Sequence, residues 1–73
     1  MKDQEADLLV ERIVAKLKAR REELGLSVNR TAELAGMSHV GLLQIESGAR
    51  SPHLRTVLKI AASLELPLTE LFS

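Results

Sequence analysis

Phe72 is the only aromatic residue in this chain of 73 residues, and this scarcity restricts the folds that the chain can form. The β-branched residues do not alternate with polar residues over any useful length, so β-strands have almost no support. Cysteine is absent, which excludes a disulfide framework and a thiolate metal site. We therefore expect one small all-α domain with an aliphatic core.

The charges of the chain balance overall but are unevenly distributed. Ten Lys and Arg residues match ten Asp and Glu residues, so the formal net charge is zero. Residues 1–11 hold one Lys and four acidic residues, a net −3, whereas residues 12–21 hold five basic and no acidic residues, a net +5. Such a basic stretch either meets phosphates or forms a solvated helix face, and the sequence leaves both interpretations open.

The sequence shows neither a membrane span nor a signal peptide. Apolar runs such as Leu8-Leu9-Val10 are far shorter than the roughly 20 residues that a spanning helix needs. The charged start of the chain also lacks the form of a secretion signal. We expect a cytoplasmic location and no membrane partner.

Apolar spacing predicts a long first helix. Apolar residues recur at helical intervals from about Gln4 until Gly25 stops the pattern. Val10 and Val14 form a second apolar stripe beside the first. This stripe faces either the core or a partner, and both interpretations stay open.

Two short helices around a glycine turn are predicted next. Ser27 is placed to cap a helix over residues 28–35, and Gly36 supplies the positive φ of a tight turn. Ser38 is placed to cap a third helix over residues 39–46, which ends at the following Ser-Gly pair. A pair of helices joined in this way has the outline of a helix-turn-helix.

The last third of the chain predicts two more helices. Ser51 and Pro52 have the pattern of an N-cap followed by proline at the first helical position, and apolar residues then keep a 3.6-residue period as far as residue 64. A final short helix over residues 68–72 would dock Leu68 and Leu71 on the core. The expected architecture is therefore five helices.

The second and third helices carry the residues that a helix-turn-helix needs where its helices cross. Ala32 is small enough for close crossing, Gly36 makes the turn, and Leu42 and Ile45 are spaced to point inward from the third helix. This spacing alone is only moderately specific.

Several motifs in the same order resemble the phage repressor and Cro type of helix-turn-helix proteins, the XRE-like family. They are Leu17 to Arg21, Gly25-Leu26-Ser27, Ala32 to Ser38, Ile45-Glu46-Ser47-Gly48, Pro52 and Leu68-Thr69-Glu70-Leu71-Phe72. The resemblance covers Ile13 to Phe72. We expect a helix-turn-helix DNA-binding domain over residues 13–73 and an amino-terminal extension of helix 1 over residues 1–12. The resemblance implies a compact lambda-repressor-like DNA-binding domain that acts without a cofactor as a homodimer on a palindromic operator.

The resemblance also implies roles for individual residues. Base reading is expected of His39, Val40 and Gln44, whose side chains can meet guanine, a thymine methyl group and adenine. Phosphate contacts are expected of Asn29, Ser38, Ser47, Arg50, His53 and Arg55, with plain surface polarity as the alternative for each. Structural roles are expected of Arg21, Ala32, Gly36, Leu42, Ile45 and Glu46, with Arg21 and Glu46 as an ion pair.

The chain departs from the family pattern in its second and third helices. Val28 stands where glutamine commonly contacts a phosphate, so that contact is absent. Thr31 stands where leucine is usual, and we expect its hydroxyl to bond a backbone carbonyl one turn earlier. Gly41 either permits close approach to DNA or is a tolerated surface glycine. The recognition helix has no Lys or Arg, so affinity would depend on phosphate anchoring and dimerisation.

The sequence also leads to expectations about assembly, regulation and catalysis. We expect dimerisation through the segment from Leu66 to Phe72, with contacts from Leu66, Leu68 and Phe72, and the sequence leaves open an additional contact from the amino-terminal helix. We expect repression as the mode of regulation. Catalysis is not expected, because the Asp residues lie at the start of the chain and the serines near His39 are better explained as helix caps. No metal site is expected either.

The alternative to a DNA-binding regulator is a protein-interaction module or antitoxin-like accessory protein, which keeps the fold and contacts a partner protein through Leu43, Phe72 or the Val10 and Val14 stripe.

Overall fold

Five helices and no strands make up the protein, which confirms the predicted all-α fold. The computed structural model describes all 73 residues. The helices are α1 (Asp3–Glu23), α2 (Val28–Ala35), α3 (His39–Ser47), α4 (Leu54–Ser63) and α5 (Leu68–Leu71). Predicted and observed ends agree closely for the first three helices, because these ends depend on local caps and glycine turns.

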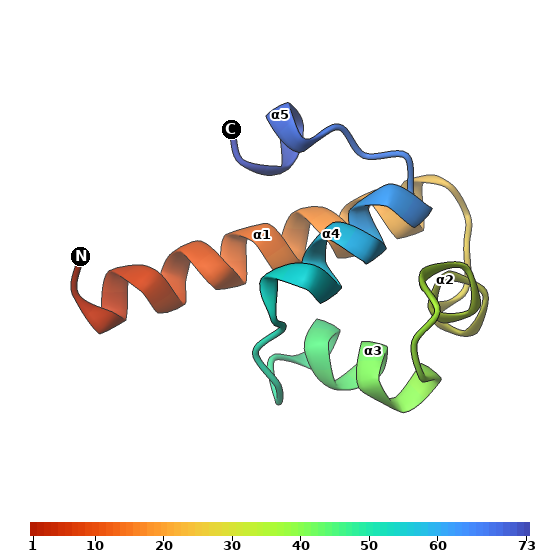
Figure 1. Cartoon of the computed structure of the whole chain (residues 1–73), viewed down its shortest axis with the longest axis horizontal. Coiled ribbons are helices and arrows are strands. Elements are labelled where there is room, and N and C mark those ends of the chain that lie inside the picture. Colours follow the sequence, from red (N-terminus) through yellow and green to blue (C-terminus); the bar gives the residue numbers. More distant parts are fainter.

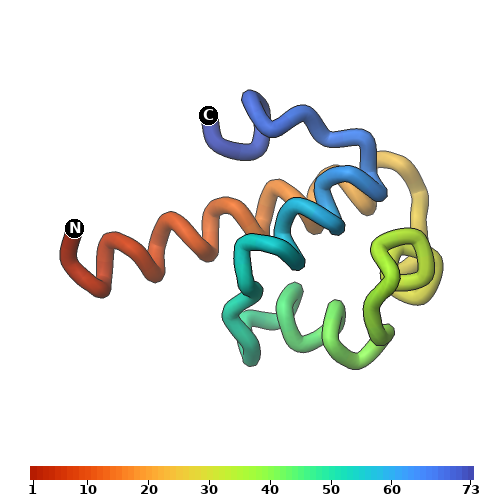
Figure 2. The backbone as a smooth tube through the Cα atoms, in the orientation of Figure 1, coloured from red at the N-terminus to blue at the C-terminus, as the bar shows by residue number.

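The helices are arranged around α1 and α4, which lie across the middle of the molecule (Figure 1). α3 lies along one edge and α5 along the opposite edge, while α2 packs at the end remote from the amino terminus (Figures 1 and 2). The first turns of α1 project beyond the other helices, and the molecule measures 35 × 25 × 19 Å. None of the helices combines the length and apolar character needed to cross a membrane.

An aliphatic core holds the helices together. Its ten buried residues are Leu17, Ala32, Ala35, Leu42, Ile45, Val57, Ile60, Ala61, Leu64 and Leu71. All five helices contribute to it, and none of its members is aromatic. Small alanines on α2 and α4 line the core between these two helices, whereas the sequence analysis expected Ala32 to allow the close crossing of the second and third helices.

Serine side chains and glycines fix the ends of α2 and α3. The Ser27 hydroxyl accepts a hydrogen bond from the backbone N–H of Arg30 at 3.0 Å, and the Ser38 hydroxyl accepts one from Gly41 at 3.0 Å. Gly36 ends α2 with a φ of 67°, which an L side chain adopts only with strain. Both serines therefore act as helix caps.

The predicted start of α4 is wrong. Ser51 and Pro52 precede the helix, and its N-cap is His53, whose side chain makes no capping hydrogen bond. The chain needs these two residues for the connection from α3, because the Arg50 backbone N–H first bonds back to the Gln44 carbonyl at 3.1 Å. The pattern Ser-Pro is therefore part of the loop.

Two further side-chain predictions are also wrong. The Thr31 hydroxyl is buried and has no hydrogen-bond partner, so the expected bond to a backbone carbonyl one turn earlier is not made. Leu68 is 51% exposed and does not dock, although Leu71 is buried. Leu66 packs against the core in its place, because the chain enters the core before α5 begins.

Basic residues on one side of α1 connect it to the last third of the chain. Lys16 Nζ donates to the backbone oxygens of Glu70 at 2.9 Å and Ser73 at 2.8 Å, and Arg12 Nη2 donates to Ser73 O at 3.1 Å. One turn farther along, Arg20 Nε donates to the carbonyl of Leu64 at 3.0 Å. Carbonyls near helix ends lack partners within their own helix, so these cations satisfy them. This part of the basic stretch is thus structural.

Candidate nucleic-acid interface

The outer face of α3 holds the residues that the resemblance assigns to base reading. His39, Val40 and Gln44 are exposed, Val40 by 61% of its surface, while Leu42 and Ile45 on the opposite face are buried. Leu43 is also exposed on the outer face, where the sequence analysis had assigned it to contact with a partner protein and not to base reading. Helical spacing could have found it, because residues 39, 40, 43 and 44 share one side of a helix.

An ion pair fixes α3 to α1 from behind. Arg21 Nε lies 2.7 Å from Glu46 Oε2, and Arg21 Nη2 lies 2.8 Å from Glu46 Oε1, so the guanidinium binds the carboxylate through two parallel hydrogen bonds. Arg21 Nη1 also donates to the Leu26 carbonyl at 2.8 Å. The pair therefore joins α1, the loop that precedes α2, and the end of α3.

The surroundings of Arg21 favour its charged form. Its side chain is 12% exposed and that of Glu46 is 10% exposed. The hydrogen bond that Arg21 donates to Glu46 and the nearby negative charges of Glu46 and Glu22 raise the pKa of Arg21 above its ordinary value, against the opposing effect of burial. Arg21 consequently keeps its charge throughout the physiological pH range.

A small hollow lies between the first turn of α3 and the start of α4. Its volume is about 210 Å³, and we call it the α3–α4 hollow. It is lined by Met37, Ser38, Gly41, Ile45, Arg50, Ser51, Pro52, His53, Thr56 and Lys59. These residues include two cations and a histidine but no carboxylate, which gives the hollow the charge and the donors that suit an anion.

Three of the six predicted phosphate-binding residues meet at the α3–α4 hollow, namely Ser38, Arg50 and His53. The other three lie elsewhere on the exposed surface. Asn29 is in the first turn of α2, and Arg55 is in the first turn of α4. The Ser47 hydroxyl is engaged at the end of α3, where it donates to the Gln44 carbonyl at 3.1 Å.

Lys59 is a member of the hollow that the sequence analysis missed. Its ammonium group donates to the carbonyl of Gly36 at 3.4 Å, which places a positive charge at the turn between α2 and α3. The available signal was its spacing from His53 and Thr56, which are six and three residues earlier and lie on the same side of α4.

Gly41 is buried, so the interpretation of it as a tolerated surface glycine is wrong. A Cβ built there would lie 2.9 Å from the Ser38 hydroxyl and 3.5 Å from Arg50 Nη1. Glycine thus leaves room for the Ser38 hydroxyl that caps α3, whereas the contact with Arg50 would be of ordinary length.

A comparison of the sequence with protein families decides the family. The Helix-turn-helix profile matches residues 17–71, which include every helix and omit the projecting start of α1. The chain belongs to the helix-turn-helix family. The α2–turn–α3 unit described above is its helix-turn-helix.

The helix-turn-helix chain is similar to several curated regulators. It is 42% identical over 52 residues to the HTH-type transcriptional repressor RghR of Bacillus subtilis (strain 168), a match that covers 70% of this chain and 38% of RghR. It is 40% identical to the HTH-type transcriptional regulators SutR and PuuR of Escherichia coli (strain K12), over 57 and 53 residues. These matches cover 78% and 73% of this chain but only 32% and 29% of the relatives. No solved structure matches the chain significantly.

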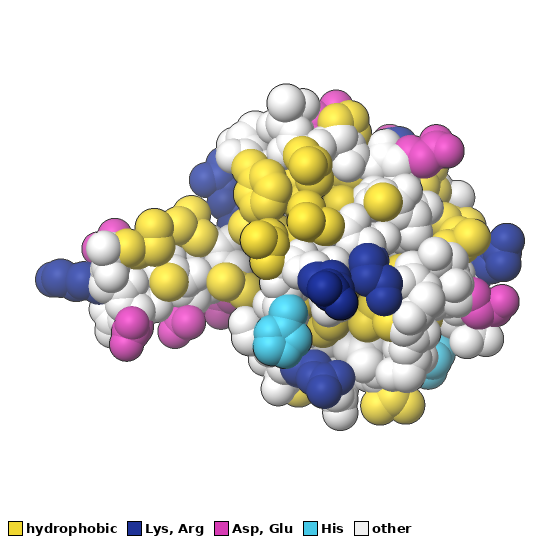
Figure 3. Space-filling model, viewed as in Figure 1, with side chains coloured by type: hydrophobic (Ala, Val, Ile, Leu, Met, Phe, Trp, Pro, Cys, Tyr) yellow, Lys and Arg dark blue, Asp and Glu magenta, His cyan; other side chains and the backbone are white.

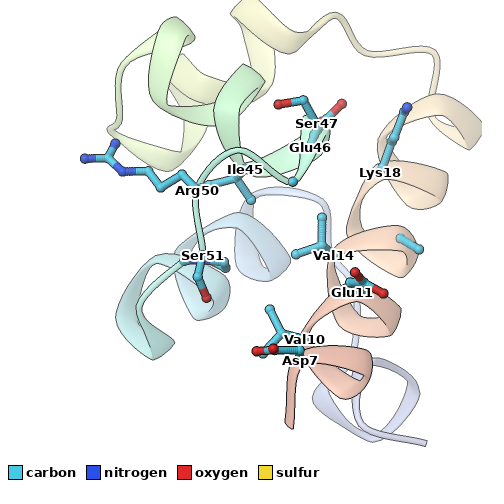
Figure 4. Close-up of a pocket in the computed structure, with 13 residues that line it drawn as sticks. Asp7, Val10, Glu11, Val14, Lys18, Ile45, Glu46, Ser47, Arg50 and Ser51 are labelled. Atoms are coloured by element: carbon cyan, nitrogen blue, oxygen red, sulfur yellow. The ribbon is translucent and has the colours of Figure 1, made fainter. Parts of the chain in front are cut away.

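A second depression separates the helix-turn-helix from the start of α1, and we call it the α1–α3 groove. It has a volume of about 530 Å³. Val10 and Val14 on α1 and Ile45 on α3 form its apolar lining, and Asp7 and Glu11 project from the α1 side (Figure 4). Both residues of the second apolar stripe of α1 are half-buried, and Val14 packs against the core whereas Val10 does not.

Several large apolar side chains of α4 and of the segment around α5 remain exposed. They are Leu54, Leu58, Leu68 and Phe72, which are 65%, 37%, 51% and 53% exposed. We call this set of residues the α4–α5 apolar face. Figure 3 shows hydrophobic side chains gathered over this part of the molecule and along one edge of the projecting α1. It contains two of the three predicted dimerisation residues, while Leu66 is half-buried.

Proposed function

We propose that the chain is a sequence-specific, double-stranded DNA-binding regulator that acts as a repressor and binds a palindromic operator as a dimer. One observation carries this proposal: α3 presents His39, Val40 and Gln44 on its outer face while its inner face is fixed in the core. A helix exposed in this way can enter the major groove.

The three exposed side chains differ in what they can recognise. Gln44 can donate to and accept from adenine at the same time, which distinguishes adenine from the other bases. His39 can donate to an acceptor of guanine, and Val40 can contact the methyl group of thymine. Membership of the helix-turn-helix family supports these roles.

Phosphate anchoring is proposed to come from the α3–α4 hollow. Arg50, His53 and Lys59 line it without a neighbouring carboxylate. Because α3 itself has no Lys or Arg, affinity depends on such contacts outside the recognition helix. Asn29, Ser38, Ser47 and Arg55 are the remaining proposed contacts.

Dimerisation and repression are supported by different observations. Leu68 and Phe72 are exposed on the α4–α5 apolar face, and a second copy would remove them from water. Leu66 would support this face from the core side. Repression is supported by the name of one relative, the transcriptional repressor RghR.

The test is a selection of bound duplexes from a random DNA pool at low salt, followed by titrations of the enriched duplex and a scrambled one. We expect a palindromic motif, and we expect Gln44→Ala to lower affinity for it by about tenfold or more. The matched control is Gln4→Ala, which removes the only other glutamine and should leave affinity unchanged. A folded protein that enriches no duplex would contradict the proposal.

A protein-interaction module is the second candidate, and the α1–α3 groove favours it. Val10 and Val14 offer apolar surface there beside Asp7 and Glu11. The two candidates differ in salt dependence, because phosphate contacts weaken steeply as salt rises whereas apolar contacts do not.

A further inference from the structure

The α1–α3 groove follows a continuous stripe of α1 that the rest of the chain covers only in part. The residues of α1 that line it are Asp7, Val10, Glu11, Val14, Ala15 and Lys18. Their spacing places them on one side of the helix, and the stretch from residue 7 to residue 18 rises about 16 Å. The opposite wall is the end of α3 and the loop that follows it. The groove is therefore about as long as three turns of a second helix.

The middle of this stripe is apolar and partly open to solvent. Val10 and Val14 are half-buried and point toward the loop after α3 (Figure 4). Ile45 and Pro52 add apolar surface from the other wall. Ala15 is exposed and small, so another backbone can approach α1 closely there. Burial of this surface by an apolar segment of a partner would remove it from water.

The charges of the groove are divided between its two ends. Asp7 and Glu11 line the end near the amino terminus, and neither takes part in a salt bridge. Like charges four residues apart on a helix repel one another. Lys18 lies about 10 Å farther along α1, and Arg50 extends away from α1 (Figure 4). A cation supplied by a partner would therefore stabilise the acidic end.

A helix fits the groove better than a nucleic acid or a strand does. Unpaired carboxylates repel phosphates, so the DNA backbone does not suit the acidic end. The walls from α1 and α3 offer no edge to an extended strand, because helical backbone groups bond within their own helix. An amphipathic helix needs only side-chain contacts, and its apolar residues recur at the same spacing as those of α1.

We propose that the α1–α3 groove binds an amphipathic helix of another protein, about three turns long, with Lys or Arg residues at one end. The cationic end lies beside Asp7 and Glu11. Apolar side chains one turn apart cover Val10 and Val14, and an acidic residue at the other end meets Lys18. The division of charge in the groove thus sets the orientation of the partner helix.

Binding in the groove opposes binding to DNA, and this part of the proposal rests on the proposed function. Ser47 and Arg50 line the groove and are also proposed phosphate contacts. Ser51 and Pro52 of the same loop line both the groove and the α3–α4 hollow. A helix in the groove and a DNA backbone at the hollow therefore need the same loop. Such coupling is reciprocal, so the partner weakens operator binding and the operator weakens partner binding.

The first test is a selection against the full chain from a library of helical peptides whose surface positions are randomised. We expect enriched peptides to carry Lys or Arg at one end and apolar residues at helical spacing. Heteronuclear NMR of the labelled chain then locates the bound peptide, and we expect shifts at residues 7–18 and in the loop after α3. No enrichment, enrichment of acidic peptides, or shifts confined to the α4–α5 apolar face would overturn the proposal. Groove shifts that depend on protein concentration without peptide would indicate a second copy and also overturn it.

A variant of the apolar surface tests the middle of the groove. Val10→Asp should weaken binding of the enriched peptide by about tenfold or more, because it places a charge against the apolar side of the peptide. The matched control is Leu8→Asp, because Leu8 is 65% exposed and does not line the groove. Fluorescence anisotropy measures affinity, and circular dichroism checks that each variant is folded. Equal effects of the two variants would contradict the proposed site.

Charge reversal tests the acidic end. Glu11→Lys should weaken peptide binding by at least about threefold, with a smaller loss at high salt. The control is Glu5→Lys, which makes the same change of charge on α1 outside the groove. A peptide with Glu in place of its basic residues should regain affinity for the double variant Asp7→Lys, Glu11→Lys. Equal losses from Glu11→Lys and Glu5→Lys would show non-specific attraction and overturn the orientation.

The DNA experiments separate this proposal from the proposed function. If the random DNA pool yields an enriched duplex, saturating peptide should weaken its binding by at least about tenfold, and Glu11→Lys should reduce that effect. Peptide and duplex that bind together at full affinity would overturn the competition. A chain that enriches no duplex, but binds the peptide with these variant effects, would contradict the proposed function and support the groove as a partner site.

Discussion

The cations of α1 and the cations around the α3–α4 hollow are the same residue types, but they do different things. Arg12, Lys16 and Arg20 donate to backbone oxygens of the last ten residues, and Arg21 binds Glu46. Arg50 lines an open hollow with no carboxylate beside it and makes no side-chain hydrogen bond or salt bridge, and Lys59 in the same hollow makes only the 3.4 Å bond to the Gly36 carbonyl. The lesson is that the acceptors within reach decide whether a cation stabilises the fold or remains available for a ligand.

The largest effect on stability is expected when the carboxylate that binds Arg21 is removed. Glu46→Ala should lower the free energy of unfolding by about 3 kcal/mol, because it leaves a largely buried guanidinium without its partner. Urea unfolding measures the change. The control is Glu33→Ala, whose exposed pair with Arg30 should contribute less than about 0.5 kcal/mol. An unchanged melting temperature together with abolished DNA binding would assign Glu46 to DNA contact instead.

The opposite outcome is expected at the hollow. Arg50→Ala should weaken binding to a one-half-site duplex by about tenfold for all sequences and lower the salt dependence by about one counterion, without loss of stability. Arg12→Ala is the control, because its guanidinium already bonds within the protein and should leave the salt dependence unchanged. Titrations across salt concentrations measure both. Equal effects from the two variants would remove the distinction between the two sets of cations.

A smaller loss of stability is expected when one of the side chains that hydrogen-bond α1 to the last residues of the chain is truncated. Lys16→Ala removes donors to Glu70 and Ser73 and should lower stability by about 1 kcal/mol, since these bonds are exposed to solvent. Thermal unfolding at fixed protein concentration measures it. If the variant instead kept its stability and lost affinity for a one-half-site duplex, Lys16 would belong with the DNA-binding cations.

The smallest change in stability is expected in the loop between α4 and α5, to which Arg20 donates hydrogen bonds. Glu65 has a φ of 52°, the only positive φ among the non-glycine residues, and its carbonyl accepts a hydrogen bond from Arg20 at 3.5 Å. Glu65→Gly should raise stability by about 0.5 kcal/mol, because relief of strain exceeds the added entropy of the unfolded chain. Arg20→Ala should then cost less in the Glu65→Gly background than in the wild type. A destabilised Glu65→Gly variant would show that the Glu65 side chain contributes more than its backbone strain costs.

The predictions that held for the site concern residues within one or two turns of each other. The caps at Ser27 and Ser38 follow from local sequence, and so does the assignment of His39 and Gln44 to the outer side of α3. Lys59 was missed because it joins the hollow from another helix, 23 residues after the glycine carbonyl to which it donates.

The sequence by itself determined the helices, the turn and the aliphatic character of the core. Periodicity, caps and glycines act between neighbours in the chain, so a single sequence contains them. Only the tertiary structure decided which cations are internal, because Arg12 and Arg20 meet acceptors 61 and 44 residues away. It also left Leu68 exposed and the Thr31 hydroxyl without a partner, since each depends on the packing of segments that lie far apart in the sequence.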